Sequence, residues 1–559
     1  MNNDKNQCEL NLVPSSEIQA PFLLKDRLFW FTFLAGGVIL SFTLWFDLGV
    51  DVCFYNYCAW IWDKYHLPPY IGFVDWDFPG IFILHLVAIK LFGEEELGFR
   101  IFDFLVQWSC VAMIFYLARR LTHNGVAGLF GGLFYSVYYY SIGKGYTGER
   151  DGFLAWIMLL IVVIWIGLGN RIYLRAMLTG ALSGFAFLVK PTIGLLWVAL
   201  GLWILVMGIK QKDSRRWREL FIYGFFCLVP SLLVILFYWE RGYLKEMYEI
   251  LALMIFKLYP QIPVTVKLAH EDPIKVSRSA LIIYQLLIIL NENPLILIGA
   301  LIFILEYLYR QRRNSDRELF WLIVIMSLVG LSSIFIQHHS WPYHRIPLWA
   351  MIMILGGGGW VFILEKVRAG SQSLMSRGIR VGLSIVLLAI IITSIPPELQ
   401  EFPFKYCFRS FKTSQRLSSN PVEQAADFIK SQLKPEDEIY FFGEFSKVRI
   451  LFLIKRKLPV PYPFVYYLSL KLKDGSISKL QEYWIKDYVE TFLRIKPRFF
   501  IFSTRPPSGL VGIKEPIIIL KEDFSGVWQA LNQNYKLVKK FGAIEIYEIN
   551  TAQPSSPRQ

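Results

Sequence analysis

The chain contains a series of long apolar segments that a water-soluble domain could not bury. A helix needs about 20 apolar residues to cross a hydrocarbon core roughly 30 Å thick. About eleven segments approach this length: 28–46, 101–117, 125–142, 153–169, 176–190, 191–208, 220–239, 294–309, 319–337, 346–364 and 381–396. Only 18% of the residues are charged, against about 25% in ordinary soluble domains. The sequence therefore predicts an α-helical polytopic membrane protein.

Two of the apolar segments decide how often the chain crosses the membrane. The run 176–208 is too long for one crossing, and Lys190-Pro191 interrupts it. Proline favours the first turn of a helix and disfavours helical geometry in the residue before it, so we expect a helical hairpin with Lys190 at its tip. The segment 79–93 would reach only about 22 Å at about 1.5 Å per residue. We interpret it as a surface or re-entrant helix.

The distribution of Lys and Arg orients these segments. If 79–93 does not cross, the basic clusters all fall on one side: Arg119-Arg120, Arg171 with Arg175, 210–218, 310–317 and 366–380. Cytoplasmic loops carry such an excess of basic residues. We therefore place the N-terminus in the cytoplasm and the C-terminus outside. The net charge of +14 belongs to these loops, so we do not expect a nucleic-acid partner.

The composition changes after Pro396-Pro397, where no further apolar span follows. Short strands are expected at 438–443, 498–503 and 544–548, alternating with helices at 420–433, 475–494 and 523–534. This alternation predicts a small α/β domain outside the membrane. The expected divisions are a cytoplasmic tail 1–27, a membrane domain 28–397, a linker 398–420, the α/β domain 421–550 and a disordered tail 551–559.

Acidic and aromatic residues gather in the first outer loop, between positions 47 and 97. Asp51, Tyr55 and Ala59 are spaced i, i+4, i+8, so they share one face of a helix. An aspartate held on such a face can act as a general base. The alternative is an amphipathic helix whose acidic residues are simply solvated.

Further charged side chains fall in the same outer layer. They are Glu149-Arg150-Asp151, Lys190, and His344-Arg345 in the motif HHSWPYHR. The planar fork of an arginine suits a phosphate, whereas a solvated loop, an N-cap and a snorkelling lysine are the simpler interpretations. The long loop 240–278, which contains Tyr259, is either a mobile gate or a connector. Since the middles of the spans carry almost no charge apart from Asp103, we favour chemistry on a lipid-borne substrate over translocation.

No cofactor is predicted from the sequence. The six cysteines form no CxxC pair, which gives no support for a cysteine metal site. The three histidines of HHSWPYHR match no standard zinc spacing. We therefore predict no metal and keep a divalent ion as the minor alternative.

Taken together, these pieces resemble the GT-C glycosyltransferase superfamily, and within it the bacterial relatives of protein O-mannosyltransferases and of the lipid A aminoarabinose transferase. The resemblance covers the whole membrane part, and its specificity lies in the order of the motifs. In chain order they are DLGVDVCFYNYCAWIWDKYHLPPYIGFVDWDFPGIFIL, FGEEELGFRIFDFL, YTGERDGFLAW, GALSGFAFLVKPTIG and YHRIP.

The resemblance implies an enzyme of the bacterial cytoplasmic (inner) membrane. It would pass a sugar from a polyprenyl phosphate, with inversion, to a hydroxyl group of a lipid, glycan or protein acceptor. The implied catalytic base is Asp51, with Asp47 as its rival, and Asp151 is the second acidic position. The implied substrate-binding residues are Glu149, Arg150, Lys190, Tyr259, His344 and Arg345, of which Lys190, His344 and Arg345 would hold the lipid phosphate.

Three other functions compete with this one. They are a lipid or solute transporter, a polymerase or ligase of lipid-linked glycans, and a non-catalytic membrane assembly protein. A transferase predicts that replacement of Asp51 by alanine abolishes product while folding and donor binding survive.

The predicted orientation is testable by cysteine labelling in intact cells. In a background without native cysteines, Ser340→Cys and Gly443→Cys should react with an impermeant thiol reagent, because we place both residues outside. Arg216→Cys and Arg313→Cys should react only after the cells are permeabilised. Labelling at position 313 but not at 443 in intact cells would reverse the orientation.

Overall fold

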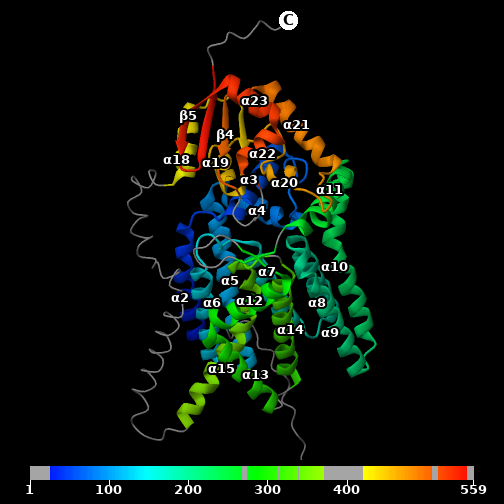
Figure 1. Ribbon diagram of the computed structural model, residues 1–559. Helices are drawn as coiled ribbons and strands as arrows, with labels where there is room; N and C mark the ends of the chain where they lie inside the picture. The colour runs from blue at the N-terminus through cyan, green and yellow to red at the C-terminus, as the bar shows by residue number, and fades with distance from the viewer. Residues whose placement is uncertain are drawn as a thin grey trace, which may run out of the picture.

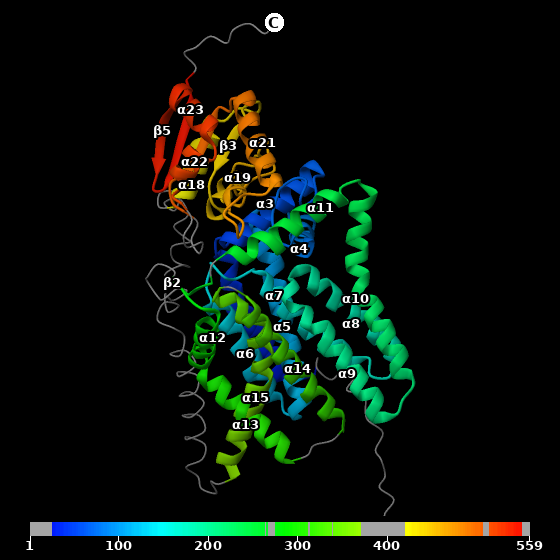
Figure 2. The ribbon, with the colours of Figure 1, turned by 45° about the vertical axis from the view of Figure 1, so that its right-hand side comes forward.

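Two parts stack on one another in the computed structural model (Figure 1). The described residues are 25–262, 264–266, 274–310, 314–337, 339–369, 420–506 and 514–550. A bundle of long helices carries a small α/β domain at one end. The shorter helices α3 (Val50–Tyr65) and α4 (Pro79–Phe92) lie between the two parts in both views (Figures 1 and 2). The first loop therefore lies at the junction of the bundle and the domain.

Within the described residues, eight helical segments are long and apolar enough to cross a membrane: Arg27–Trp45, Glu96–Thr122, Arg150–Gly167, Ile172–Val189, Pro191–Gln211, Arg215–Glu240, Arg317–Ile336 and Pro342–Lys366. Their main helices are α2 (Arg27–Ser41), α5 (Glu96–Thr122), α7 (Arg150–Gly167), α8 (Ile172–Val189), α9 (Leu195–Gln211), α10 (Arg215–Glu240), α14 (Asn314–Ile336) and α15 (Ile346–Ala369). Helix α6 (Gly125–Ser141) packs against α2, α5 and α15. Each predicted span up to 346–364 is thus helical.

Several sequence predictions fall outside the described residues. They are the eleventh span 381–396, nearly all of the linker 398–420, the tails 1–24 and 551–559, and the positions His338 and Arg313. Among the rest, α4 has 14 residues, as expected of a segment too short for a crossing. Helix α8 ends at Val189, and a 3₁₀ turn begins at Pro191. Lys190 therefore stands at the tip of a hairpin, as predicted.

A bent helix pair was missing from the sequence prediction. Helices α12 (Arg278–Glu292) and α13 (Pro294–Arg310) meet at an angle of 90° and together have the length and hydropathy of one span, either broken or re-entrant. The polar run Asn291-Glu292-Asn293 ends α12, and Asn293 alone lies between the two helices. Because each half alone is shorter than the roughly 20 residues of a crossing, only the second half was predicted.

The described residues between 240 and 278 form more regular structure than a connector would. They contain α11 (Leu244–Leu251), a π-helical segment (Ala252–Leu258), a 3₁₀ turn (Tyr259–Gln261) and the two antiparallel pairs of β1 (Thr265–Val266) with β2 (Ile274–Lys275). Met247 and Met254 pack in the same apolar cluster as Tyr70 and residues of the α/β domain. This segment therefore braces the junction, and its role as a gate stays a prediction.

The α/β domain is built on a four-stranded sheet in the order β3-β4-β6-β5. Strands β3 (Ile439–Phe442) and β4 (Phe499–Ser503) are parallel and fully buried, and β6 (Ile544–Ile549) pairs antiparallel with β4 and with β5 (Tyr535–Phe541). Its helices are α18 (Pro421–Gln432), α19 (Phe445–Leu453), α20 (Tyr466–Ser469), α21 (Lys479–Ile495), α22 (Pro516–Glu522) and α23 (Ser525–Asn534). The edge strand β5 was not predicted, because its lysines hide the strand pattern.

One arginine of the α/β domain binds acidic groups from both parts of the molecule. The guanidinium of Arg449 in α19 donates to both carboxylate oxygens of Glu96, at 2.6 and 2.8 Å. It also lies 3.1 Å from Glu423 and 3.6 Å from Asp47. The arginine side chain is only 10% exposed, so little water screens these ion pairs. Arg449 therefore fixes the domain to the first loop.

Replacement of Arg449 should loosen this attachment. Arg449→Ala removes the cation that Glu96 and Glu423 share, while Asp47 keeps Lys144. These carboxylates are partly exposed, so we expect a cost above the roughly 1 kcal/mol of a surface ion pair and below the roughly 3 to 5 kcal/mol of a fully buried one. We expect a clear drop in the thermal midpoint of the purified full chain. Lys486→Ala, which breaks an exposed pair with Glu490, is the control and should cost about 0.5 kcal/mol or less. Equal midpoints for the two variants would contradict the role of Arg449.

Candidate active site

Asp51 stands in the first turn of α3, at the junction of the bundle and the α/β domain. The hydroxyl of Tyr343, in the 3₁₀ turn Pro342–Arg345, donates to its Oδ2 at 3.4 Å. Burial raises the pKa of the Asp51 carboxyl, and the positive charge of Arg150 opposes that rise. A carboxylate with a raised pKa in a polar cluster is suited to accept a proton near neutral pH.

Asp77 joins α3 to the first turn of α7. Its Oδ2 accepts a hydrogen bond of 2.6 Å from the hydroxyl of Tyr55, and its Oδ1 forms an ion pair with Arg150. The Arg150 guanidinium also lies 5.6 Å from the centre of the Tyr55 ring. Asp77 falls within the acidic first loop (47–97), but no site role was predicted for it. The signal that was available is its position two residues before Pro79, which begins helix α4.

Lys190 and Asp151 form a buried ion pair at the hairpin tip. The ammonium group donates to Asp151 Oδ2 at 2.6 Å and to Gln337 Oε1 at 2.8 Å. It also lies 5.7 Å from the centre of the Tyr343 ring. Burial lowers the pKa of Lys190, and Asp151 opposes that shift. Of these partners, Gln337 was missed, because an uncharged residue at the end of a span carries no sequence signal.

Polar atoms in this cluster keep hydrogen-bonding capacity that the described residues do not use. The unpartnered buried atoms are Glu149 Oε2, Arg150 Nε, Asp151 Oδ1 and Asp75 Oδ2. Buried polar groups are normally hydrogen-bonded, so a concentration of unsatisfied atoms calls for an explanation. A polar ligand at this junction would provide one.

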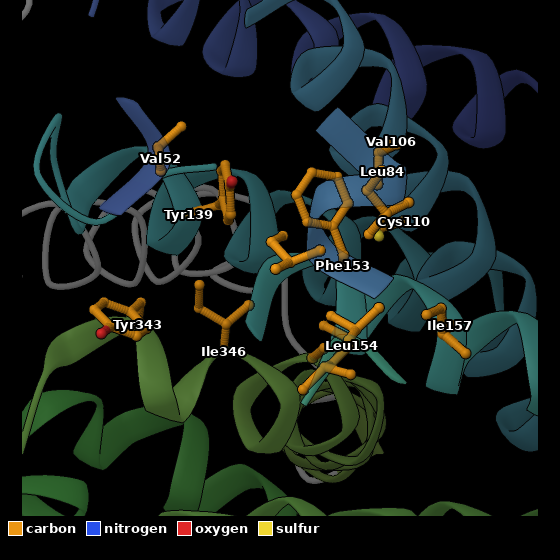
Figure 3. Packing of buried hydrophobic residues seen from close by; sticks show 14 of the residues in the cluster. Val52, Leu84, Val106, Cys110, Tyr139, Phe153, Leu154, Ile157, Tyr343 and Ile346 are labelled. Carbon is orange, nitrogen blue, oxygen red and sulfur yellow. The ribbon is translucent and has the colours of Figure 1, made fainter. Parts of the chain in front are cut away.

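Apolar and aromatic side chains of the same elements form a buried cluster. Figure 3 shows Tyr343 and Ile346 opposite Val52 and Tyr139, with Leu154 beside them. All five belong to one buried cluster. Charges set among such residues interact more strongly than they would in water.

Asp47, the rival to Asp51, lies in different surroundings. Its carboxylate is 41% exposed and pairs with Lys144 at 3.5 Å and with Arg449 at 3.6 Å. Neither cation belongs to the cluster around Asp51. The two aspartates are therefore separated by environment, one in the polar cluster and the other in the attachment of the α/β domain.

Arg345 and His344 are also engaged within the protein. Both arms of the Arg345 guanidinium bind Glu292, at 2.7 and 3.0 Å, and Trp349 Nε1 donates to the same carboxylate at 2.8 Å. His344 Nδ1 lies 3.1 Å from the carbonyl oxygen of His339. The arginine fork that the sequence analysis assigned to a phosphate is thus occupied by a carboxylate from the α12–α13 break.

Tyr259 lies over the aromatic part of the junction. Its ring centre is 5.7 Å from that of Trp76, edge to face. Trp76 in turn packs at 4.5 Å against Tyr467 of α20. The structure thus brings Tyr259 next to the first loop and the α/β domain.

Arg100, in α5, connects the two acidic loops. It donates to the carbonyl oxygens of Phe46 at 3.1 Å and of Thr147 at 3.2 Å. A side chain at Gly49 would lie 2.9 Å from the carbonyl oxygen of Gly145, so the loops approach closely here. These contacts fix the backbone before Asp51 relative to the backbone before Glu149.

No group of three or more His, Cys, Asp or Glu side chains in the described part of the chain is arranged to hold a metal ion. The prediction of no metal stays a prediction.

Comparison with known proteins gives matches of two kinds. Residues 79–239 match the family of dolichyl-phosphate-mannose-protein mannosyltransferases. Undecaprenyl phosphate-alpha-4-amino-4-deoxy-L-arabinose arabinosyl transferases from Pseudomonas aeruginosa (strain UCBPP-PA14) and Pseudomonas paraeruginosa (strain DSM 24068 / PA7) are each 33% identical over 151 residues. That match spans 26% of this chain and 27% of each relative.

Two solved structures resemble the whole chain. ArnT from Cupriavidus metallidurans bound to undecaprenyl phosphate aligns with a TM-score of 0.57 and 14% identity, over 93% of this chain and 98% of that one. Its apo state aligns with a TM-score of 0.54 and 15% identity, over 92% and 96%.

The chain has the ArnT fold. The resemblance to GT-C membrane glycosyltransferases related to the lipid A aminoarabinose transferase is thereby confirmed, as is the predicted fold of a helical membrane protein with a small α/β domain. At 14% identity the ArnT structure supports the fold alone. The chemistry has to be argued from the residues of this chain.

The electrostatics of Glu149 predict how stability depends on pH. Burial, and next the charge of Asp51, raise the pKa of this carboxyl well above its ordinary value of 4.5. The folded protein then holds the proton more tightly than the unfolded chain does. Stability from this group is complete below the ordinary pKa and is lost as the pH rises through the raised pKa.

Glu149→Gln imitates the protonated acid, so this variant should not lose folding stability through position 149 as the pH rises. We expect the thermal midpoint of the variant to exceed that of the unmodified protein increasingly as the pH rises from about 5 to about 8. Thermal unfolding of the purified chain across this range measures the effect. Glu490→Gln, at an exposed position, should give a constant offset. If the difference in thermal midpoint between Glu149→Gln and the unmodified protein is also independent of pH, the raised pKa of Glu149 is contradicted.

Proposed function

We propose that the protein is an integral-membrane glycosyltransferase that moves a sugar from a polyprenyl-phosphate donor to a hydroxyl group of an envelope acceptor. One observation carries the proposal. The Asp51 carboxyl shares a buried cluster with two cations, Arg150 and Lys190, and with the Tyr343 hydroxyl. A base, cations and a hydrogen-bond donor at one point are the groups that transfer from a phosphate-linked sugar requires.

In this proposal Asp51 removes the proton from the acceptor hydroxyl. The acceptor oxygen forms a bond to the anomeric carbon as the bond from that carbon to the phosphate oxygen breaks. The attack comes from the face opposite the phosphate, so the configuration inverts. The proton ends on Asp51, and the polyprenyl phosphate leaves with one more negative charge than it had as a diester.

We assign the charge of the leaving phosphate to Lys190 and Arg150. Both cations are buried, where their electrostatic effect on a developing negative charge is larger than in water. His344 lies close enough to both for their charges to interact, so we place it beside the phosphate. Arg345 is bound to Glu292, and we give it a positioning role at the α12–α13 break.

Asp151 and Glu149 complete the proposed binding site. Asp151 orients Lys190 through the ion pair of 2.6 Å. Glu149, as a protonated acid, would donate a hydrogen bond to the substrate. Tyr259 would cover the sugar from the side of the α11 segment. No step in this scheme needs a metal ion.

The donor and the cellular location follow from the relatives by analogy. The relatives are named for an undecaprenyl-phosphate-linked amino pentose, so we propose an undecaprenyl-phosphate sugar as the donor. We place the enzyme in a bacterial cytoplasmic membrane, with the N-terminus in the cytoplasm and the site and α/β domain outside. The acceptor is a lipid, a glycan or a protein, and mass spectrometry of cell envelopes with and without the gene would identify it.

Substitution of the proposed base separates catalysis from binding. Asp51→Asn should keep its affinity for the donor and lose at least about a hundredfold in rate, because a general base contributes about 10² to 10⁴. Lys190→Ala should weaken donor binding and slow turnover together, because the phosphate is charged before and during the reaction. Calorimetric binding and single-turnover assays of the purified chain measure these effects.

Asp47→Asn is the matched control, because it removes the same charge from the same loop outside the cluster. It should keep most of the turnover. If Asp47→Asn is inactive and Asp51→Asn is active, Asp47 is the base. If both remain active, the first-loop mechanism is wrong and a transporter function becomes the better explanation.

A further inference from the structure

Asp75 is a buried acid that the proposed reaction does not use. Its side chain is 0% exposed, and its Oδ2 has no hydrogen-bond partner among the described residues. Its Oδ1 accepts a long hydrogen bond, of 3.4 Å, from the hydroxyl of Tyr467, and the backbone N–H groups of Trp76 and Asp77 also favour the ionised form of the carboxyl. Leaving a buried acceptor unsatisfied costs stability, so this arrangement needs a reason.

In the neighbouring acid Asp77, both carboxylate oxygens have a partner. Asp77 has Tyr55 on one oxygen and Arg150 on the other. Within the described residues, no cation forms an ion pair with Asp75, two residues earlier. Burial and the charge of Asp77 raise the pKa of the Asp75 carboxyl. A positive group or a hydrogen-bond donor brought close to it would stabilise the ionised carboxylate, lower this pKa again and so be bound favourably.

Tyr467, which binds this carboxyl, belongs to a cluster of aromatic rings. Trp76 is half-buried and packs between Tyr467, at 4.5 Å, and Tyr259, at 5.7 Å. The loop is held in place by the backbone N–H of Val74, which donates to the carbonyl oxygen of Pro461 at 2.7 Å. Asp75 and Trp76 both contact Tyr467. An acceptor oxygen and an apolar ring are therefore held near one another, and a sugar ring presents the two complementary surfaces.

The location connects this group with the reaction. Tyr467, which binds Asp75, lies close enough to Asp51 and Arg150 for their charges to act on it. Asp77, two residues from Asp75, forms an ion pair with Arg150, and the charge of Arg150 also acts on Asp51. The Asp75–Tyr467 pair therefore adjoins the cluster around the proposed base, and the α/β domain contributes part of it. The sugar is the part of the donor that has to lie beside the base.

We propose that Asp75 is a specificity-determining residue that accepts a hydrogen bond from a hydroxyl or amino group of the transferred sugar, with Trp76 packed against the sugar ring. This inference rests on the proposed transferase function. In the proposed transferase, Lys190 and Arg150 hold the lipid phosphate, and Asp75 contributes only to recognition of the sugar. Binding of the lipid phosphate without a sugar is then independent of Asp75.

The test uses the full chain in lipid nanodiscs and three ligands. They are undecaprenyl phosphate, undecaprenyl-phosphate 4-amino-4-deoxy-L-arabinose and undecaprenyl-phosphate L-arabinose, with affinities measured by calorimetry. Asp75→Ala should bind undecaprenyl phosphate within about twofold of the unmodified protein and lose about tenfold or more for the preferred glycosylated ligand, the size of a lost hydrogen bond to a charged group. Asp474→Asn, at an exposed acid, should change none of the three.

Asp75→Asn distinguishes the two kinds of donor group. If the partner is an ammonium group, the neutral amide loses affinity as the alanine does. If the partner is a hydroxyl, the amide oxygen still accepts and most of the affinity remains. Tyr467→Phe, which removes only the hydroxyl on Asp75, is the milder variant and should reduce the preference for glycosylated ligand in the same direction.

Three results would overturn parts of the scheme separately. Equal losses for all three ligands in Asp75→Ala, and an unchanged preference in Tyr467→Phe, would make Asp75 a structural residue. Unchanged affinities in Asp75→Ala would also refute the inference. If the unmodified protein binds none of the three ligands, the proposed function itself fails.

Discussion

The buried ion pair between Lys190 and Asp151 is the contact on which the candidate site depends. It ties the break in the α8–α9 hairpin to the first turn of α7, and Gln337 at the end of α14 completes the coordination of the ammonium group. Loss of either partner would leave an unpaired buried charge, at a cost of about 3 to 5 kcal/mol. Three parts of the bundle therefore meet at one point because one cation has to be neutralised.

The α/β domain is part of this site as well as a neighbour of it. Arg449 anchors the domain to the first loop through Glu96, and Tyr467 binds Asp75 from α20. Tyr57 of α3 donates to the backbone of Arg456 at 3.1 Å. Since the same loop carries Asp51, the position of the domain and the position of the proposed base are mechanically linked. A displacement of the α/β domain would therefore displace the loop that carries Asp51.

Some of the charged residues near the site have protein partners for their polar atoms, and others keep a buried oxygen without one. Asp47 and Arg345, both candidates from the sequence, have their charges matched by protein partners. Glu149, Asp151 and Asp75 each retain one buried oxygen without a partner among the described residues. Natural proteins satisfy most buried polar atoms, and exceptions are expected where a ligand completes the set. This contrast supports the division between attachment and substrate recognition that we propose.

The sequence by itself determined the helical membrane fold, the hairpin at Lys190-Pro191 and the layer in which the charges gather. Those features depend on local properties: apolar length, proline geometry and the spacing of charges along the chain. It could not separate Asp51 from Asp47, and it gave no role to Asp75, Asp77, Gln337 or Arg100. Those roles depend on partners tens to hundreds of residues away, such as Glu292 for Arg345 and Tyr467 for Asp75. Only tertiary packing decides which charge is neutralised and which is left for a ligand, because burial and pairing are properties of the assembled structure.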